Sequence, residues 1–212
     1  MEKKKMKLWK KILLVFIIIF VLFAIHTIRN YIILTKLVNN GKEIANSTNY
    51  YAEVTGIQDD KTVNMTKCYK NGNEYLTVVG QDIYNQDKRK MEIYANEDEK
   101  FAVLSSEEGK ILLKDNIVLE DIQPANISKH IYDKMFALQI SAIAKIRKEK
   151  CHDKECYLVE LDKNWKMWVE IDTGLIVREI NGAETAERKY EFDVIKDGDI
   201  VKPDTTNCIV SN

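Results

Sequence analysis

The chain is poor in the residues that break regular structure and in those that often carry chemistry. It has two prolines, eight glycines and three histidines among 212 residues. Such low proline and glycine contents exclude a collagen-like chain and a long Pro/Gly-rich disordered one. The sequence also lacks nucleophile elbows, Walker loops, His-Glu-x-x-His helices and paired metal-ligand cysteines. We therefore expect a protein that is not an enzyme and that uses no metal and no cofactor.

Formal charge is missing from one long segment, Ile12 to Ile28. At ~1.5 Å per residue this segment spans about 26 Å, which is enough to cross a bilayer core. Six lysines precede it, against the single acid Glu2, and only Arg29 follows directly, so the positive-inside rule places the N-terminus in the cytoplasm. We predict a cytoplasmic tail (1–11) and a transmembrane anchor (12–28). A cleaved signal peptide and a buried helix of a soluble protein are the alternatives.

The remainder of the chain is acidic and carries all the cysteines. It holds 25 basic and 32 acidic residues, a net charge of −7, which disfavours a nucleic-acid partner. Four cysteines in an exported domain allow three disulfide connectivities. We expect Cys151 to pair with Cys156, because four intervening residues would place them opposite each other in a hairpin. By elimination, Cys68 would then pair with Cys208.

Hydrophobic periodicity predicts a helix followed by a mostly β domain. Residues 29–48 have helical spacing, interrupted at Asn39-Asn40-Gly41 by poor helix formers. From Asn49 the period changes to two, and Asn71-Gly72 predicts a tight hairpin turn. We expect an extracytoplasmic domain over 49–212, with strands at 49–55, 62–69, 74–79, 90–95, 100–105 and 111–114.

The second half of the domain is predicted to begin with a short helix. Its apolar face runs from Ile127 to Phe136, with Asn126 or Ser128 as the N-cap. Alternation from Leu138 to Ile146 predicts a return to strand. Further strands are expected at 156–161, 165–171, 175–180 and 188–195, before an extended tail after Pro203.

Several stretches resemble the LolA-like superfamily of bacterial envelope proteins. They are Asn49-Tyr-Tyr51, the strand–turn–strand from Lys166 to Arg178 (KMWVEIDTGLIVR), Tyr190-Glu-Phe192 and Val201-Lys-Pro-Asp204. The resemblance implies an α+β fold in which an open, curved antiparallel sheet, a half-barrel, is covered by short helices. It also implies a sheet that holds acyl chains or lipidated partners. The family's carriers use an arginine on an early strand, and none occurs between Asn30 and Lys88, so no functional residue is carried over.

The candidate ligand contacts are apolar residues on the short helix and on one strand. Flexible methionines suit a variable apolar guest, although the same residues can equally fill a core. Trp168 lies on the other face of its strand, among charges, either packed by a neighbour or placed at the rim of a site. The full set is Met135, Phe136, Met167, Trp168, Val169 and Ile171.

These expectations combine into one hypothesis with one main alternative. The hypothesis is a single-pass protein of the cell membrane whose extracytoplasmic domain binds an acyl chain, a lipoprotein or another amphiphile of the envelope. The alternative is a non-enzymatic protein-interaction or sensor module with a filled core. The membrane is a partner in both cases, and a second envelope protein is a partner in the alternative.

The predicted topology exposes residues 36–212 on the outside of the membrane. Protease added to intact spheroplasts should therefore remove the domain and leave a small N-terminal fragment, as detected with an N-terminal epitope tag. A cytoplasmic protein probed in the same sample controls for lysis. Full protection of the domain would contradict the orientation.

Overall fold

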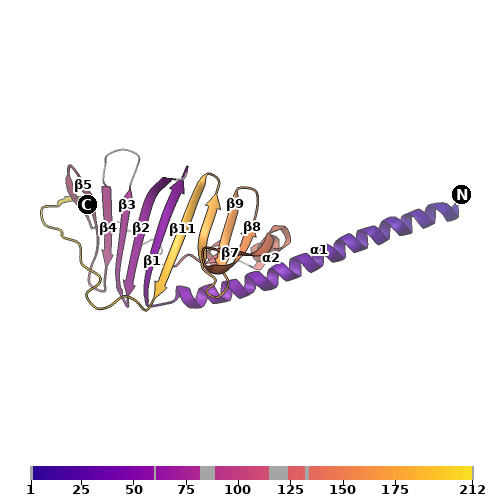
Figure 1. Ribbon diagram of the computed structural model, residues 1–212, viewed down its shortest axis with the longest axis horizontal. Coiled ribbons are helices and arrows are strands. Elements are labelled where there is room, and N and C mark those ends of the chain that lie inside the picture. The colour runs from indigo at the N-terminus through magenta and orange to yellow at the C-terminus, as the bar shows by residue number, and fades with distance from the viewer. Residues whose placement is uncertain (1, 60, 82–88, 115–123, 132–133, 212) are drawn as a thin grey trace.

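The computed structural model describes residues 2–59, 61–81, 89–114, 124–131 and 134–211. One long helix, α1 (Glu2–Ala45), leads into a large curved sheet that does not close into a barrel. The N-terminal half of α1 extends away from the sheet, and its C-terminal half runs along it (Figure 1). The predicted fold class, a mostly β domain behind an apolar N-terminal helix, is confirmed.

Twelve strands form the sheet within the described ranges, and β7 and β12 lie at its two edges. Neighbouring strands are antiparallel except for β12, which pairs with β6 in parallel. The strand order is β12-β6-β5-β4-β3-β2-β1-β11-β10-β9-β8-β7. The bounds are β1 (Asn49–Gln58), β2 (Lys61–Asn71), β3 (Glu74–Gln81), β4 (Arg89–Ala95), β5 (Lys100–Ser106), β6 (Gly109–Leu113), β7 (Lys145–Cys151), β8 (Lys154–Glu160), β9 (Trp165–Glu170), β10 (Ile176–Asn181), β11 (Glu184–Phe192) and β12 (Ile209–Ser211).

Local turn chemistry explains much of this order. Asn71 pairs with Glu74 across a two-residue turn in which Gly72 has φ +59°, so the predicted hairpin is confirmed. Asn181 and Glu184 are joined in the same way, with Gly182 at φ +65°. Consecutive strands are neighbours in the sheet, which produces the two meanders β1–β6 and β7–β11.

The helix-facing side of the sheet is packed against α1. Leu34 and Leu37 of α1 are almost fully buried among side chains of β7 to β10. Near the end of the helix, Ile44 packs on Tyr50 and Leu175. Two short helices complete this layer, the 3₁₀ turn η1 (Ile127–His130) and α2 (Lys134–Ile143).

The opposite side of the sheet has its own core over β3 to β6. Tyr94, Phe101 and Val103 are buried there and are covered by Ile195 and Ile200, which follow β11. The two halves of the sheet therefore bury opposite faces, one under the helices and one under the C-terminal segment.

The predicted break at Asn39-Asn40-Gly41 is wrong, since α1 continues without interruption to Ala45. The Asn40 side-chain amide donates to the carbonyl of Ile171 at 3.0 Å. A Cβ at Gly41 would lie 2.9 Å from the carbonyl oxygen of Gly174. These residues are suited to close packing of the helix on the sheet, and tertiary contacts outweigh their weak helix propensity.

The strand predicted over Leu138–Ile146 is also wrong, because most of it belongs to α2. Ile140, Ser141 and Ala144 are buried there at helical rather than alternating spacing, and buried Ile146 belongs to β7. The predicted N-cap is confirmed at Asn126, whose side chain accepts from the backbone amide of Ser128. This cap begins η1, and α2 follows as a separate helix.

The structure does not contain the expected disulfides, because all four cysteines are free thiols. Cys151 pairs with Lys154 and Cys156 with Glu149, so the two thiols are diagonal neighbours and do not face each other. Burial raises the pKa of the Cys156 thiol to about 11.

The Cys68–Cys208 prediction fails for a different reason. Cys68 packs on the helix-facing side of the sheet with Tyr50 and Tyr190, whereas Cys208 packs with the core on the opposite side. The sheet separates the two thiols. Burial also raises the pKa of the Cys68 thiol.

Substitution of Gly174 tests how closely α1 packs on the sheet. Gly174 has φ +66°, and an added Cβ would lie 2.1 Å from the carbonyl oxygen of Leu37. Gly182 has a similar φ of +65° and nothing within 4 Å of its Cβ position. Both changes to alanine should cost about 1 to 2 kcal/mol for the left-handed backbone. Gly174→Ala should cost about 1 to 3 kcal/mol more, because the helix must shift.

Chemical denaturation of both variants in detergent, followed by circular dichroism, would measure the difference. Equal losses of stability would contradict the close packing of α1 on the turn at Gly174.

Candidate functional site

Met167 and Val169, two of the predicted ligand contacts, lie in the core beneath α1. They are 1% and 0% exposed and belong to the same buried cluster as Leu34 and Leu37. Ile171 follows the end of β9 and is half-buried. Helix side chains therefore occupy the space into which these strand residues point. Their role as ligand contacts stays a prediction, but the packing favours the alternative of a filled core.

Trp168 lies on the other face of β9 and is largely covered. Its indole nitrogen donates to Glu149 at 3.1 Å, and the guanidinium of Arg178 lies 5.1 Å from the ring centroid. Only 8% of the side chain is exposed. Trp168 is thus an aromatic packed by cross-strand neighbours, one of the two interpretations made from the sequence.

The helical candidates lie apart from these strand residues. Phe136 is on α2 and is 40% exposed, while the side chain of Met135 lies outside the described part of the structure. The predicted residues therefore do not converge on one described cavity.

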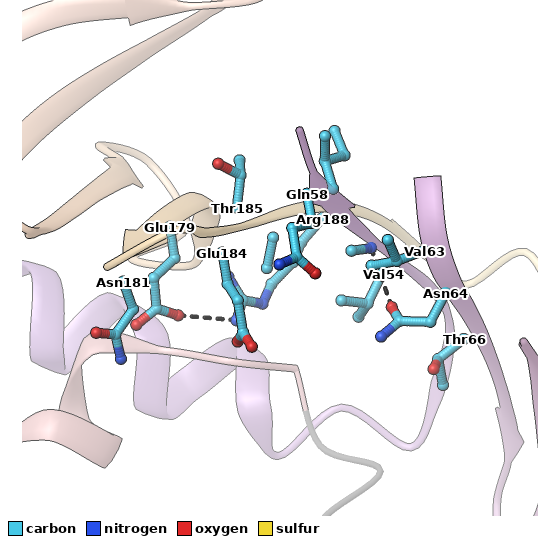
Figure 2. A pocket seen from close by; sticks show the side chains of 13 residues that line it. Val54, Gln58, Val63, Asn64, Thr66, Glu179, Asn181, Glu184, Thr185 and Arg188 are labelled. Carbon is cyan, nitrogen blue, oxygen red and sulfur yellow. Dashed lines mark hydrogen bonds and ion pairs between the residues drawn. The ribbon is translucent and has the colours of Figure 1, made fainter. Parts of the chain in front are cut away.

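A different group of residues forms a hollow of about 440 Å³ on the helix-facing side of the sheet (Figure 2). It lies where β1, β2, β10 and β11 run beyond the core at Tyr50, Ala52 and Tyr190. Aliphatic, amide, hydroxyl and charged side chains share its lining. The lining residues are Val54, Gly56, Ile57, Gln58, Val63, Asn64, Thr66, Glu179, Asn181, Glu184, Thr185, Ala186 and Arg188.

The central charged group of this hollow is an ion pair between neighbouring strands. Arg188 Nη2 donates to Glu179 Oε2 at 2.9 Å, and both side chains are only 14% exposed. The indole of Trp165 donates to the other carboxylate oxygen, Glu179 Oε1, at 3.1 Å. Arg188 Nη1 is buried and has no hydrogen-bond partner among the described residues. A buried donor of this kind is stabilised when an acceptor on a ligand reaches it.

A β-bulge shapes another part of the hollow. The register of β1 and β2 shifts between Gly56 and Ile57. Asn64 Oδ1 accepts from the Gly56 amide at 3.1 Å, and a Cβ at Gly56 would lie 2.3 Å from that oxygen. The absence of a side chain at Gly56 therefore leaves room for the Asn64 side-chain amide to lie against the face of the sheet at this position.

The sequence contained a weak signal for this site. Arg188 stands between Ala186 and Tyr190 at alternate positions of one strand, so a charge lies between a small and an aromatic residue on one face. Its pairing with Glu179 depends on the register of β10 and β11, which alternation alone does not give.

The described residues offer little for metal or acid–base chemistry. No group of three or more His, Cys, Asp or Glu side chains among them could hold a metal ion. A second hollow, of about 340 Å³, opens on the opposite face beside His152 and Glu187. His152 Nε2 lies 3.8 Å from Glu187 Oε2 there and is well exposed. The first hollow, with a buried ion pair and an unsatisfied donor, is the better candidate for binding.

Comparisons with known proteins return only distant fold similarities. No protein-family model and no curated protein match the chain. Among solved structures it is similar to the crystal structure of MucB, with TM-score 0.44 and 8% identity over 81% of this chain and 62% of that one. MucB in complex with MucA(peri) gives TM-score 0.33 and 7% identity over 74% and 55%. The chain thus spans less than two thirds of the MucB chains, and the LolA-like family stays a prediction.

Substitution of Met167 distinguishes a filled core from a ligand cavity. Met167→Ala should cost about 2 to 5 kcal/mol of stability, because it leaves a hole beneath α1. Met65→Ala is the matched control, since Met65 is 37% exposed and should cost less than about 1 kcal/mol. Thermal unfolding of the delipidated chain, with and without added fatty acid, measures both. A small loss for Met167→Ala together with stabilisation by fatty acid would support the cavity instead.

Proposed function

We propose that the chain is a membrane-tethered, non-enzymatic interaction module that binds a peptide segment of an envelope protein in the hollow around Arg188. The observation that carries this proposal is the filling of the helix-facing core by α1. Leu34 and Leu37 occupy the side of the sheet where a carrier would hold its guest. Binding is therefore assigned to a surface site.

The exposed stretch of α1 supports the tether. Within the described residues, α1 is the one helix long and apolar enough to cross a membrane. Side chains from Ile12 to Phe23 are between 39% and 70% exposed, although they are all apolar. A bilayer would cover this surface. In water, each exposed Å² of apolar surface would cost about 25 cal/mol of free energy. The lysines before Ile12 support a cytoplasmic N-terminus and an extracytoplasmic domain.

The lining of the hollow supports a peptide as the ligand. Gln58, Asn64 and Asn181 bring amide groups that match the donors and acceptors of a peptide backbone. Arg188 Nη1 can bond to a carboxylate or carbonyl oxygen of the same segment. Val54 and Val63 add aliphatic contact area next to these groups.

A second candidate is the binding of an amphiphile beside the hollow. Val79, Met91, Leu104 and Ile111 pair successively across β3 to β6, so they form one apolar row on the helix-facing side. Ile111 is 37% exposed and the other three are half-buried. An acyl chain laid along this row would cover apolar surface that water otherwise reaches.

Site-specific photo-crosslinking in living cells tests the proposal. Benzoylphenylalanine at Gln58, which is exposed beside the hollow, should give an adduct with the mass of a partner polypeptide. The same group at Lys189, which lies on the opposite face of β11 and is 66% exposed, is the control and should give none.

The amphiphile candidate predicts a different adduct. Benzoylphenylalanine at Leu104 would then capture lipid, while Gln58 would capture no protein. Equal protein adducts at Gln58 and Lys189 would contradict a specific site in the hollow.

A further inference from the structure

We infer that the α2 end of the domain rests on the outer surface of the same membrane that α1 spans, with anionic phospholipids as its contacts. This docking surface consists of Leu138 and Ile143 of α2 and the lysines Lys145 and Lys163. The inference rests on the membrane tether proposed above, and it adds a second contact between the domain and the bilayer.

The position of α2 along α1 is fixed by a polar contact. Asn30 of α1 is fully buried and donates from its side-chain amide to the carbonyls of Ser141 at 2.9 Å and Ala144 at 2.8 Å. His26 Nε2 lies 3.2 Å from the same Ala144 oxygen. These carbonyls at the end of α2 have no partners within their own helix, so α1 caps α2. The end of α2 is therefore held within one turn of Ile28, where the predicted span ends.

The overall arrangement agrees with this placement. α2 lies at the end of the domain nearest the projecting half of α1, whereas β4 and β5 lie at the far end (Figure 1). A bilayer around residues 12–28 would thus meet α2 before the main body of the sheet. No flexible linker intervenes, since α1 is continuous through this region.

Exposed apolar side chains occur on both helices near this contact. Ile143, the last residue of α2, is 64% exposed, and Leu138 is 50% exposed. On α1, Ile28 and Ile32 are 59% and 63% exposed. Water would leave these side chains exposed, whereas the interfacial zone of a bilayer would cover them.

Basic side chains adjoin Ile143. Ile143 shares a hollow of about 400 Å³ with Lys145, Lys163 and Lys166. The two acids in the same hollow are already engaged, since Glu160 pairs with Arg147 and Lys166, and Asp162 accepts from the backbone amides that follow it. Lys145 and Lys163 therefore remain available to bind the phosphate groups of lipids.

The charge of this end differs from that of the rest of the domain. The chain after Arg29 has a net charge of −7, yet four of the seven residues of β7 are basic. A basic end is attracted to an anionic leaflet, while the acidic remainder is repelled. Lysines on an edge strand also prevent pairing with another chain. The experiment separates these two roles.

The test uses the full chain in two kinds of vesicle, one of phosphatidylcholine alone and one of phosphatidylcholine with phosphatidylglycerol. Each contains an alkyne-tagged phospholipid, so that lipid crosslinked to the protein can be detected. Benzoylphenylalanine replaces Ile143 or, as a matched control, Val201, which is 68% exposed in the C-terminal segment. We expect several-fold more lipid adduct from position 143 than from position 201, and more in the anionic vesicles.

Charge variants identify the headgroup contacts. Lys145→Gln with Lys163→Gln should lower the adduct at position 143 in anionic vesicles to the level found in phosphatidylcholine. Lys100→Gln with Lys114→Gln, exposed at the far end of the domain, should leave it unchanged. An equal effect of the two pairs would overturn the assignment of the lysines to lipid.

Two further outcomes would overturn the docking surface. Equal lipid adducts at positions 143 and 201 would show that the α2 end does not meet the membrane. An adduct joining two copies of the chain at position 143 would make this face a self-association surface. Carbonate extraction of the same vesicles reports the tether separately. Release of the chain would overturn both proposals, and retention without lipid adduct would overturn the docking surface alone.

Discussion

The close packing of α1 on the turn at Gly174 determines how the rest of the molecule is organised. Two glycines, Gly41 and Gly174, let the helix backbone approach the turn, and Asn40 bonds to the carbonyl of Ile171. Once the helix lies there, Leu34 and Leu37 fill the helix-facing side of β7 to β10. The same element therefore serves as the cover of the core and as the apolar segment that projects from it.

The sheet is wider than this helix can cover, so its two halves bury their apolar side chains in different ways. The second core lies on the opposite side of β3 to β6, beneath Ile195 and Ile200. Between the two cores, β1, β10 and β11 run past the packed side chains and form the hollow with its buried Glu179–Arg188 pair. An isolated buried charge is unfavourable, and the Glu179 carboxylate is compensated by Arg188 and by a second donor, the indole of Trp165.

The sequence predicted features that depend on neighbouring residues and missed those that depend on distant ones. Period-two alternation and the Asn71-Gly72 turn are local, so most strands and the first hairpins were expected correctly. The helix from Lys134 to Ile143 depends on Asn30, which is more than one hundred residues away in the chain and caps its end. The thiols of Cys68 and Cys208 could not be assigned to opposite faces without the strand register. Arg188 was likewise visible as a charge, but its partner Glu179 was not.

The continuity of α1 has a consequence for where this protein can find a partner. If the bilayer ends near Ile28, the helix from Arg29 to Ala45 rises about 26 Å at 1.5 Å per residue. A rigid helical spacer of this kind keeps the β domain at a nearly constant distance from the membrane surface, whereas a flexible linker would let that distance vary. Under the proposed function, the domain would then meet its partner by diffusion within a thin layer parallel to the membrane. The peptide segment proposed as its ligand would have to lie in that layer, on a protein of the same membrane or on one held close to it.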